Sequence, residues 1–217
     1  MARYGLIVFD WDGTLVDSMA RIVGAMRATM VDLALPERTD AELRAGIGLG
    51  FDEVVDRLFP GLSRAERAHV RSTFRDYFLE GGQSAQLFPG AHDALSKLAG
   101  AGSTLAVATG KGRAGLDQEL LETGLGGLMV ATRCVDECAS KPAPDMLLQL
   151  MDYSGHGRAE TLMVGDSEYD LLMARNAGTA SVGVGGGAHT RDALLRHAPI
   201  AVIGSVAELP TLLATGR

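Results

Sequence analysis

Six short apolar runs, separated by segments with helical spacing, constrain the fold of this chain more than any other feature. Most of the runs are rich in Val, Leu and Ala without polar alternation, which is typical of strands buried on both faces. They occupy residues 5–10, 104–110, 128–132, 161–166, 180–185 and 200–205. Strands that alternate with helices predict an α/β fold with a Rossmann-like parallel sheet in a three-layer αβα arrangement.

One interval breaks the alternation. Residues 16–87 show no strand signal, and their apolar residues recur at helical spacing. The last helical segment of this interval opens with Ser63 and Glu66, a capping-box arrangement that is typical of a helix N-terminus. We therefore predict a core of residues 1–15 and 88–217, with an α-helical domain of residues 16–87 inserted after the first strand.

The composition argues against several kinds of partner. The formal net charge of −7 over 217 residues disfavours nucleic acid or an anionic membrane as the main partner. The apolar stretch at the N-terminus is too short for a signal peptide or a membrane span, and no later segment has about eighteen uninterrupted apolar residues. We expect a cytoplasmic protein, present as a monomer or weak homodimer, that binds neither nucleic acid nor membrane.

The two cysteines, Cys134 and Cys138, are spaced C-x3-C. No second pair of Cys or His residues stands nearby in the sequence to complete a four-ligand metal site. We therefore expect thiols with a structural or incidental role rather than a metal or redox site.

Polar side chains gather where four of the predicted strands end. Asp10 and Asp12 follow the first strand, and side chains two residues apart in an extended strand point the same way. Parallel sheets bind their ligands at these carboxyl ends of the strands. Gly13 lets the backbone turn sharply, and Thr14 adds a hydroxyl. The other strand ends supply Thr109, Gly110 and Lys111, then Lys141, and finally Asp166 with Asp170.

Together these residue types favour one kind of chemistry. Several carboxylates at one edge would repel one another unless a cation lay among them, and oxygen ligands suit Mg²⁺. A metal ion, a lysine and a threonine hydroxyl suit a phosphoryl group, which one carboxylate can attack while a second moves a proton. Any one of these residues alone is more often a turn or cap residue. Their coincidence at four strand ends favours a phosphoryl-transfer site.

The motifs at these strand ends also resemble those of a known family. DWDGT (10–14), TGK (109–111), the lysine of SKPAPD (140–145) and GDSEYD (165–170) match, in order, the motifs of the haloacid dehalogenase superfamily. The DxDGT form is that of its phosphatases, and the helical insertion resembles the cap domain of the phosphoglycolate phosphatase-like branch. The resemblance covers essentially the whole chain. It implies a Mg²⁺-dependent phosphatase that hydrolyses a small phosphoglycolate-like monoester through an aspartyl-phosphate intermediate.

The resemblance also implies a role for each acidic residue. Asp10 is the nucleophile, and Asp12 protonates the leaving alkoxide before it activates the hydrolytic water. Mg²⁺ is held by the Asp10 carboxylate, the Asp12 backbone carbonyl and Asp166, with Asp170 in support. Because Mg²⁺ and Lys141 lie close to it, Asp10 is expected to stay ionised at neutral pH.

In the same scheme, Thr109, Lys141 and the backbone N–H of Gly110 hold the phosphoryl oxygens. Lys141 also separates the charges of Asp10 and Asp166. The glycine and threonine that complete the DWDGT motif act in support. Many phosphoglycolate phosphatases carry Thr-Asn-Lys at the second motif, where this chain has Thr-Gly-Lys, so the substrate itself stays open.

Three other functions stay open at this point. A phosphomutase of the same superfamily would return the phosphoryl group to a sugar, and the sequence barely separates it from a phosphatase. A non-catalytic phospho-acceptor domain also uses Asp, Mg²⁺, Thr and Lys, but it would have neither the insertion nor Asp12. GVGGGA (183–188) matches a dinucleotide-binding fingerprint, which belongs after the first strand rather than the fifth. Its glycines are expected to serve a loop near the site.

Substrate choice is expected to fall to the helical insertion. The GIGLGF loop (46–51) has little side-chain bulk, and it either approaches the site or only turns the chain between helices. Arg21, Arg44 and Arg57 are candidates to meet an acidic substrate, and the sequence does not choose among them. Motion of the insertion over the core would exclude water from the reaction.

Overall fold

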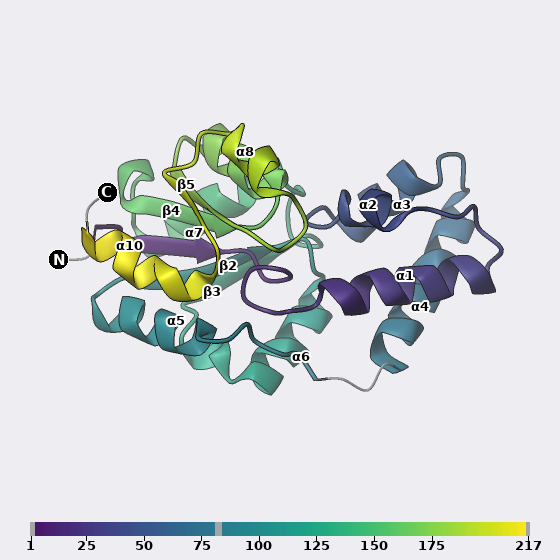
Figure 1. Ribbon diagram of the computed structural model, residues 1–217, viewed down its shortest axis with the longest axis horizontal. Helices are drawn as coiled ribbons and strands as arrows, with labels where there is room; N and C mark the ends of the chain where they lie inside the picture. The colour runs from purple at the N-terminus through teal and green to yellow at the C-terminus, as the bar shows by residue number, and fades with distance from the viewer. Residues whose placement is uncertain (1–2, 81–83, 216–217) are drawn as a thin grey trace.

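The computed structural model describes residues 3–80 and 84–215, and within these residues it contains a six-stranded sheet. Neighbouring strands run parallel, in the order β3-β2-β1-β4-β5-β6 (Figure 1). The strands are β1 Leu6–Phe9, β2 Thr104–Thr109, β3 Ala131–Cys134, β4 Thr161–Gly165, β5 Ala180–Val184 and β6 Ala201–Ile203. The α/β fold with a parallel sheet, predicted from the sequence, is confirmed.

The strand order reverses beside β1. From β1 the chain moves outward through β2 to β3, and then returns to place β4 on the other side of β1. β1 and β4 pair in register from Leu6 opposite Thr161 to Phe9 opposite Val164. Ligands of open parallel sheets bind at the carboxyl ends of the strands where the order reverses. The residues that follow β1 and β4 therefore stand where a site is expected.

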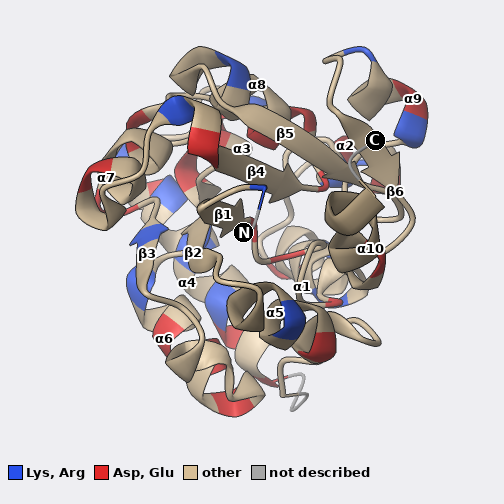
Figure 2. Ribbon diagram, turned by 90° about the vertical axis from the view of Figure 1, so that its left-hand side faces the viewer, with Lys and Arg blue, Asp and Glu red and all other residues tan. Residues whose placement is uncertain are grey.

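Helices cover both faces of the sheet (Figure 1 and Figure 2). Apolar side chains of α5, α6 and α10 pack with Ile7 and Phe9 on one face, and those of α7 and α8 pack with Leu6 and Val8 on the other. Alternate residues of β1 thus enter two separate hydrophobic clusters, as expected of a strand buried on both faces. The helix bounds are α5 Ala91–Gly100, α6 Arg113–Thr123, α7 Asp145–Ser154, α8 Glu168–Ala177, α9 Arg191–Leu195 and α10 Leu209–Thr215.

Four helices of the described residues are inserted between β1 and α5. They are α1 Met19–Asp32, α2 Asp40–Arg44, α3 Phe51–Leu58 and α4 Arg64–Glu80. In Figure 1 they form a separate group on the right, beyond the carboxyl ends of the strands, and they have a hydrophobic cluster of their own. The predicted capping box starts α4, because the Ser63 N–H donates to Glu66 Oε2 at 2.7 Å and the Glu66 N–H donates to Ser63 Oγ at 3.3 Å.

The third strand and the second helix differ most from the sequence prediction. The third strand begins at Ala131 rather than at residue 128, because Leu128 and Met129 pack against the main hydrophobic cluster before the chain enters the sheet. This strand lies at an edge of the sheet and is only half-buried over most of its length. Apolar periodicity gives no sign of α2, since five residues with one buried side chain, Leu43, carry no periodic signal, and only the capping box of Thr39 and Glu42 marks its start.

Across the described ranges, no helix is both long and apolar enough to cross a membrane. Figure 2 shows Lys and Arg interspersed with Asp and Glu on the helices around the sheet. The expected cytoplasmic location, the monomer or weak homodimer and the absence of a nucleic-acid partner stay predictions.

Candidate active site

Three carboxylates meet at the carboxyl ends of β1 and β4. Asp10 follows β1, and its backbone N–H donates to the Val164 carbonyl of β4 at 2.9 Å. Asp166 follows β4, and Asp170 stands in the first turn of α8, whose N-cap is Ser167. Each of the three aspartates offers an oxygen within 4.8 Å of the others, and none is more than 2% exposed. The structure thus brings together three of the four aspartates that the sequence places at this edge.

Lys141 lies between two of these carboxylates. Its Nζ is 2.7 Å from Asp10 Oδ1 and 2.7 Å from Asp170 Oδ1, and its side chain is fully buried. The resemblance implies that Lys141 separates Asp10 from Asp166, but the structure gives it direct contacts with Asp10 and Asp170. The physical reason is that Asp166 already accepts hydrogen bonds from two other loops.

Asp166 is held tightly by its surroundings. Its Oδ1 accepts a hydrogen bond from the Thr14 hydroxyl at 2.8 Å, and its Oδ2 accepts one from the Ala188 N–H at 2.6 Å. A Cβ at Gly13, whose φ is +81°, would lie 2.3 Å from Asp166 Oδ2, and a Cβ at Gly187 would lie 2.0 Å from the same oxygen. Both positions therefore require glycine. The glycine-rich segment after β5 borders the site, as expected.

Burial and mutual repulsion change how these acids titrate. Burial raises the pKa of Asp10 well above its ordinary value, the Asp170 carboxylate raises it further, and Lys141 only partly offsets both. Burial and Asp170 also raise the pKa of Asp166 to about 7, against the hydrogen bonds that Asp166 accepts. Burial alone would lower the pKa of Lys141, but the two carboxylates beside it outweigh burial and raise it. The ionised Asp10 expected at neutral pH therefore requires a further cation.

The donor set fits a divalent cation. Asp10, Asp166 and Asp170 together carry more negative charge than Lys141 can neutralise. A buried cluster of this kind favours either protonation or the entry of a second cation. Carboxylate oxygens are ligands that Mg²⁺ prefers. The buried triad is therefore able to hold a metal ion.

Asp12 faces a different group of residues. Its Oδ1 accepts a hydrogen bond from the Ser18 hydroxyl at 2.7 Å, and its Oδ2 is 3.2 Å from Lys111 Nζ. β1 ends at the residue before Asp10, so the side-chain alternation of a strand does not extend to the two aspartates. As a result, Asp10 contacts Lys141 whereas Asp12 contacts Lys111.

Glu119 is a buried carboxylate that sequence reasoning missed. It accepts a hydrogen bond from the Trp11 indole at 2.6 Å, pairs with Arg21 at 2.5 Å and lies 3.3 Å from Lys111 Nζ. The Arg21 guanidinium also lies 3.8 Å from the centre of the Phe78 ring of α4. Charged residues in the middle of a helix usually face solvent, and the hydrogen-bond partners Trp11 and Arg21 are distant in sequence, so no local pattern identifies Glu119.

Strand β2 ends at Thr109, which is followed by Gly110. Thr109 is buried, and its Oγ1 accepts the Lys111 N–H at 3.1 Å. Gly110 lies against the loop of residues 46–51, because a Cβ at Gly110 would lie 2.5 Å from the Leu49 carbonyl oxygen. The GIGLGF loop therefore approaches the site, and it does more than turn the chain between helices.

Two of the three candidate arginines connect the insertion with the core. Arg21 of α1 pairs with Glu119 of α6, and Arg57 of α3 donates to the Tyr169 hydroxyl of α8. Arg44 is half-buried at the end of α2. The contacts of Arg21 and Arg57 assign them to holding the insertion in place.

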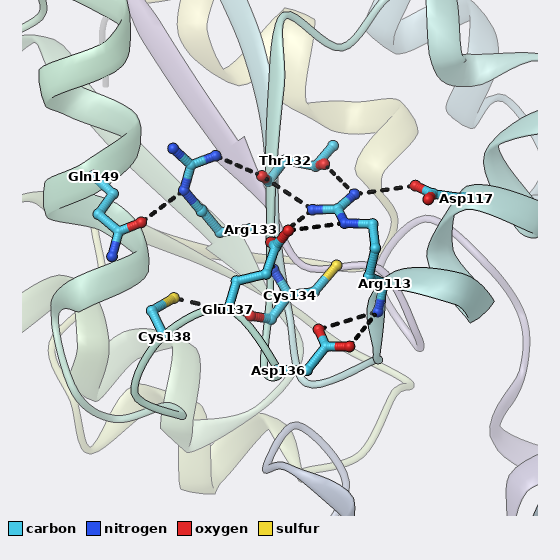
Figure 3. Close-up of polar contacts among 9 residues, drawn as sticks. All are labelled: Arg113, Asp117, Thr132, Arg133, Cys134, Asp136, Glu137, Cys138 and Gln149. Atoms are coloured by element: carbon cyan, nitrogen blue, oxygen red, sulfur yellow. Dashed lines mark hydrogen bonds and ion pairs between the residues drawn. The ribbon is translucent and has the colours of Figure 1, made fainter.

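Figure 3 shows the polar cluster around the end of β3, which holds both cysteines. Arg113, at the start of α6, donates to Glu137 and to the Thr132 hydroxyl, each at 2.7 Å. Cys134 is buried, and burial raises the pKa of its thiol to about 12. Cys138 Sγ contacts the Cys134 carbonyl at 3.9 Å. The Arg113 contacts fasten the loop after β3 to α6, and the structural or incidental role expected of the two thiols stays a prediction.

Fold and site together define a class of protein. Carboxylates, a buried lysine and a threonine stand where the strand order of a parallel sheet reverses, which is the arrangement of an α/β enzyme that handles phosphoryl groups. The sequence profile of the haloacid dehalogenase-like hydrolase family matches residues 7–184. The chain belongs to this family and is a hydrolase with a helical cap inserted into a Rossmann-like core.

Individual phosphatases resemble this chain over nearly its whole length. The chain is 37% identical to a probable phosphatase, IndB, of Dickeya dadantii, over 94% of this chain and 91% of the relative. It is 33% identical to a phosphoglycolate phosphatase of Vibrio vulnificus, over 94% and 93%. The crystal structure of a predicted phosphoglycolate phosphatase from Haemophilus somnus superposes with a TM-score of 0.88 at 26% identity, over 98% and 99%. The chain is thus a phosphatase of this family that resembles phosphoglycolate phosphatases.

Proposed function

We propose that this enzyme is a Mg²⁺-dependent phosphatase that hydrolyses a small organic phosphate monoester, with phosphoglycolate as the best single candidate. The observation that carries the proposal is the buried contact of Lys141 Nζ with Asp10 and Asp170, at 2.7 Å each, in a cluster that includes Asp166. Burying a cluster of opposite and like charges carries a large desolvation penalty, so stability alone does not explain why the cluster is present. A phosphoryl group and its metal ion are ligands that match these charges.

The phosphoryl oxygens are bound by groups from two strand ends. The Thr109 hydroxyl and the Gly110 N–H donate from the end of β2, and Lys141 contributes the positive charge. Because Lys141 already contacts Asp10 at 2.7 Å, it holds a bound phosphoryl group next to the carboxylate that attacks it. Phosphoryl transfer depends mainly on such positioning and charge neutralisation.

The metal ion would be held by Asp10, Asp166 and the backbone carbonyl of Asp12, with Asp170 in support. When bound, Mg²⁺ neutralises the carboxylates and polarises the phosphoryl group. Thr14 fixes one oxygen of Asp166 through its hydroxyl, and the glycine before it leaves room for the other oxygen.

Asp10 acts as the nucleophile, and Asp12 acts as the general acid and then as the general base. An Asp10 oxygen forms a bond to phosphorus while the ester P–O bond breaks, and Asp12 gives its proton to the leaving alkoxide. A water molecule then attacks phosphorus, transfers its proton to Asp12 and releases inorganic phosphate from Asp10. Ser18 and Lys111 hold the Asp12 carboxylate in position.

Residues 16–87 act as a cap that closes over this site. The two segments that connect them to the core pair with each other, because the Asp17 N–H donates to the Gln86 carbonyl at 2.8 Å and the Phe88 N–H donates to the Leu15 carbonyl at 2.9 Å. A narrow paired connection of this kind can bend as a unit. Closure of the cap excludes water while the first bond to phosphorus forms.

The experiment that tests this function is a screen of small phosphate monoesters for the release of inorganic phosphate. We expect turnover with Mg²⁺, loss of turnover on chelation by EDTA, and recovery when Mg²⁺ is restored. Activity that survives complete removal of metal would contradict the proposal. Isomerised sugar phosphate in place of free phosphate would indicate a phosphomutase, and release of at most one phosphate per chain would indicate a phospho-acceptor.

A further inference from the structure

We propose that Glu119 is a positioning residue of this enzyme, which fixes Lys111 beside Asp12 and thereby sets the orientation in which Asp12 protonates the leaving group. The inference rests on the proposed phosphatase function, in which Asp12 is the general acid, and it extends the site to a residue of α6. It follows from the way in which two carboxylates share one buried lysine.

The Lys111 ammonium lies between two carboxylates. Its Nζ is 3.2 Å from Asp12 Oδ2 and 3.3 Å from Glu119 Oε1, and its side chain is only 11% exposed. The Nζ also lies 5.0 Å from the centre of the Phe78 ring, whose face attracts a cation. A lysine stem is flexible, so the place where Nζ meets Asp12 depends on these other partners.

Glu119 is held from two further sides, so it can anchor Lys111. Its Oε2 accepts a hydrogen bond from the Trp11 indole at 2.6 Å, and its Oε1 accepts one from the Arg21 guanidinium at 2.5 Å. Trp11 is fully buried, and in the chain it stands between Asp10 and Asp12. The Glu119 carboxylate is therefore tied to the same turn that carries the proposed nucleophile and general acid.

The position of Lys111 determines how the Asp12 carboxylate is oriented. Asp12 Oδ1 accepts a hydrogen bond from the Ser18 hydroxyl at 2.7 Å, and Oδ2 faces Lys111. One donor on each oxygen fixes the rotation of a carboxyl group, and an acid transfers its proton only within hydrogen-bond reach of the leaving oxygen. Without the charge of Glu119, Lys111 is no longer drawn away from Asp12, so the two groups change their relative position.

The test compares two esters that differ in how much the leaving group needs a proton. The alkoxide released from 2-phosphoglycolate is strongly basic and requires protonation by Asp12, whereas 4-nitrophenolate leaves from 4-nitrophenyl phosphate without a proton. We expect Glu119→Gln to lower the ratio of kcat/KM for the alkyl ester to that for the aryl ester about tenfold, a part of what a general acid contributes. Both esters are measured on one preparation, so a smaller folded fraction lowers both values equally and leaves the ratio unchanged.

A double variant shows whether Glu119 acts through Lys111. Lys111→Met removes the ammonium but keeps an unbranched side chain, and it should lower the same ratio. Glu119→Gln/Lys111→Met should lie within about twofold of Lys111→Met alone, because the second substitution removes an interaction that is already lost. Asp117→Asn, which removes a largely exposed carboxylate from the same helix, is the matched control and should leave the ratio unchanged.

Trp11→Phe tests the same anchor without removing a charge. It deletes the indole donor to Glu119 Oε2 and should lower the ratio about threefold, less than Glu119→Gln does. An unchanged ratio in this variant would contradict the anchoring of Glu119, even if Glu119→Gln does not fold.

The indole of Trp11, the single tryptophan of the chain, supplies a readout without substrate. Its N–H donates to the Glu119 carboxylate, so its resonance in a proton–nitrogen NMR spectrum should move in Glu119→Gln and stay in place in Asp117→Asn. A resonance that is the same in all three proteins would contradict the contact.

An unchanged ratio in Glu119→Gln, in an enzyme that hydrolyses both esters, would overturn the positioning role and leave the phosphatase function standing. Falls in the ratio that multiply in the double variant would overturn Lys111 as the residue through which Glu119 acts. A wild-type protein that releases phosphate from neither these esters nor any other would overturn the phosphatase function, and the positioning role would fall with it.

Discussion

At the residue scale, the chemistry depends on where one buried lysine stands. Lys141 contacts Asp10 and Asp170, whereas Asp166 is held by Thr14 and a backbone N–H. This arrangement leaves the pKa values of Asp10 and Asp166 raised by burial and by Asp170. The ionised form of these aspartates is therefore unfavourable without a bound cation, and a bound cation would stabilise it.

The nucleophile gives the first prediction. Asp10→Asn removes the attacking oxygen and should lower turnover by about 10⁴-fold or more, as removal of a covalent nucleophile does in other enzymes. The thermal midpoint of unfolding should not fall, because Lys141 keeps Asp170 as its partner and the excess negative charge of the buried cluster decreases. Turnover within tenfold of the wild type would contradict the assignment of Asp10.

Glu119 gives a second prediction at this scale. Glu119→Gln keeps a hydrogen-bonding side chain of the same size but removes the buried negative charge that pairs with Arg21 and Lys111. We expect a loss of about 3 kcal/mol in the free energy of unfolding, measured with urea. Asp117→Asn on the same helix removes a largely exposed partner of Arg113 and should cost less than about 1 kcal/mol. Equal losses in the two variants would contradict a larger stabilising contribution from buried Glu119 than from exposed Asp117.

At the element scale, the sequence predicts the strands and helices that have a periodic apolar pattern or a turn signal at their ends. The runs of β1, β2, β4 and β5 are continuous and apolar, and their ends fall within one residue of the observed ones. The edge strand β3 is displaced, because Leu128 and Met129 are apolar for packing and not for pairing. The four strand-end motifs are recognisable because they stand directly after strands, whereas Glu119 is identified only by its ion pair with Arg21 of α1.

The capping box at the N-terminus of α4 is expected to stabilise the protein. Ser63→Ala removes the acceptor of the Glu66 N–H and should cost about 1 kcal/mol in the free energy of unfolding, a typical value for a lost N-cap. Ser72→Ala, in the exposed middle of the same helix, is the matched control and should be neutral or slightly stabilising, since alanine favours helix. A larger loss in Ser72→Ala than in Ser63→Ala would show that the capping box does not stabilise α4.

For the whole molecule, metal binding, pH and stability should be linked. Burial and Asp170 raise the pKa of Asp166 from its ordinary 3.8 to about 7. Without Mg²⁺, the stability that protonated Asp166 contributes is therefore fully present below about pH 4 and is lost as the pH rises through about 7. Mg²⁺ binds the ionised carboxylate, so the stabilisation it provides should grow over the same window.

Thermal unfolding with and without Mg²⁺ measures this linkage. The increase in the unfolding midpoint on addition of Mg²⁺ should be larger at about pH 8 than at about pH 5. Asp166→Asn should remove most of this difference, because the amide does not titrate in this range. An increase that is the same at both pH values would contradict a metal site built on these aspartates.

The proposed mechanism requires that Asp10 carry the phosphoryl group during turnover. Acid quenching of the enzyme during hydrolysis of a phosphate monoester, followed by mass spectrometry of its peptides, tests this directly. We expect a phosphoryl group on Asp10 that disappears as substrate is exhausted. Steady release of phosphate with no phosphorylated Asp10, or with the phosphoryl group on another residue, would contradict it.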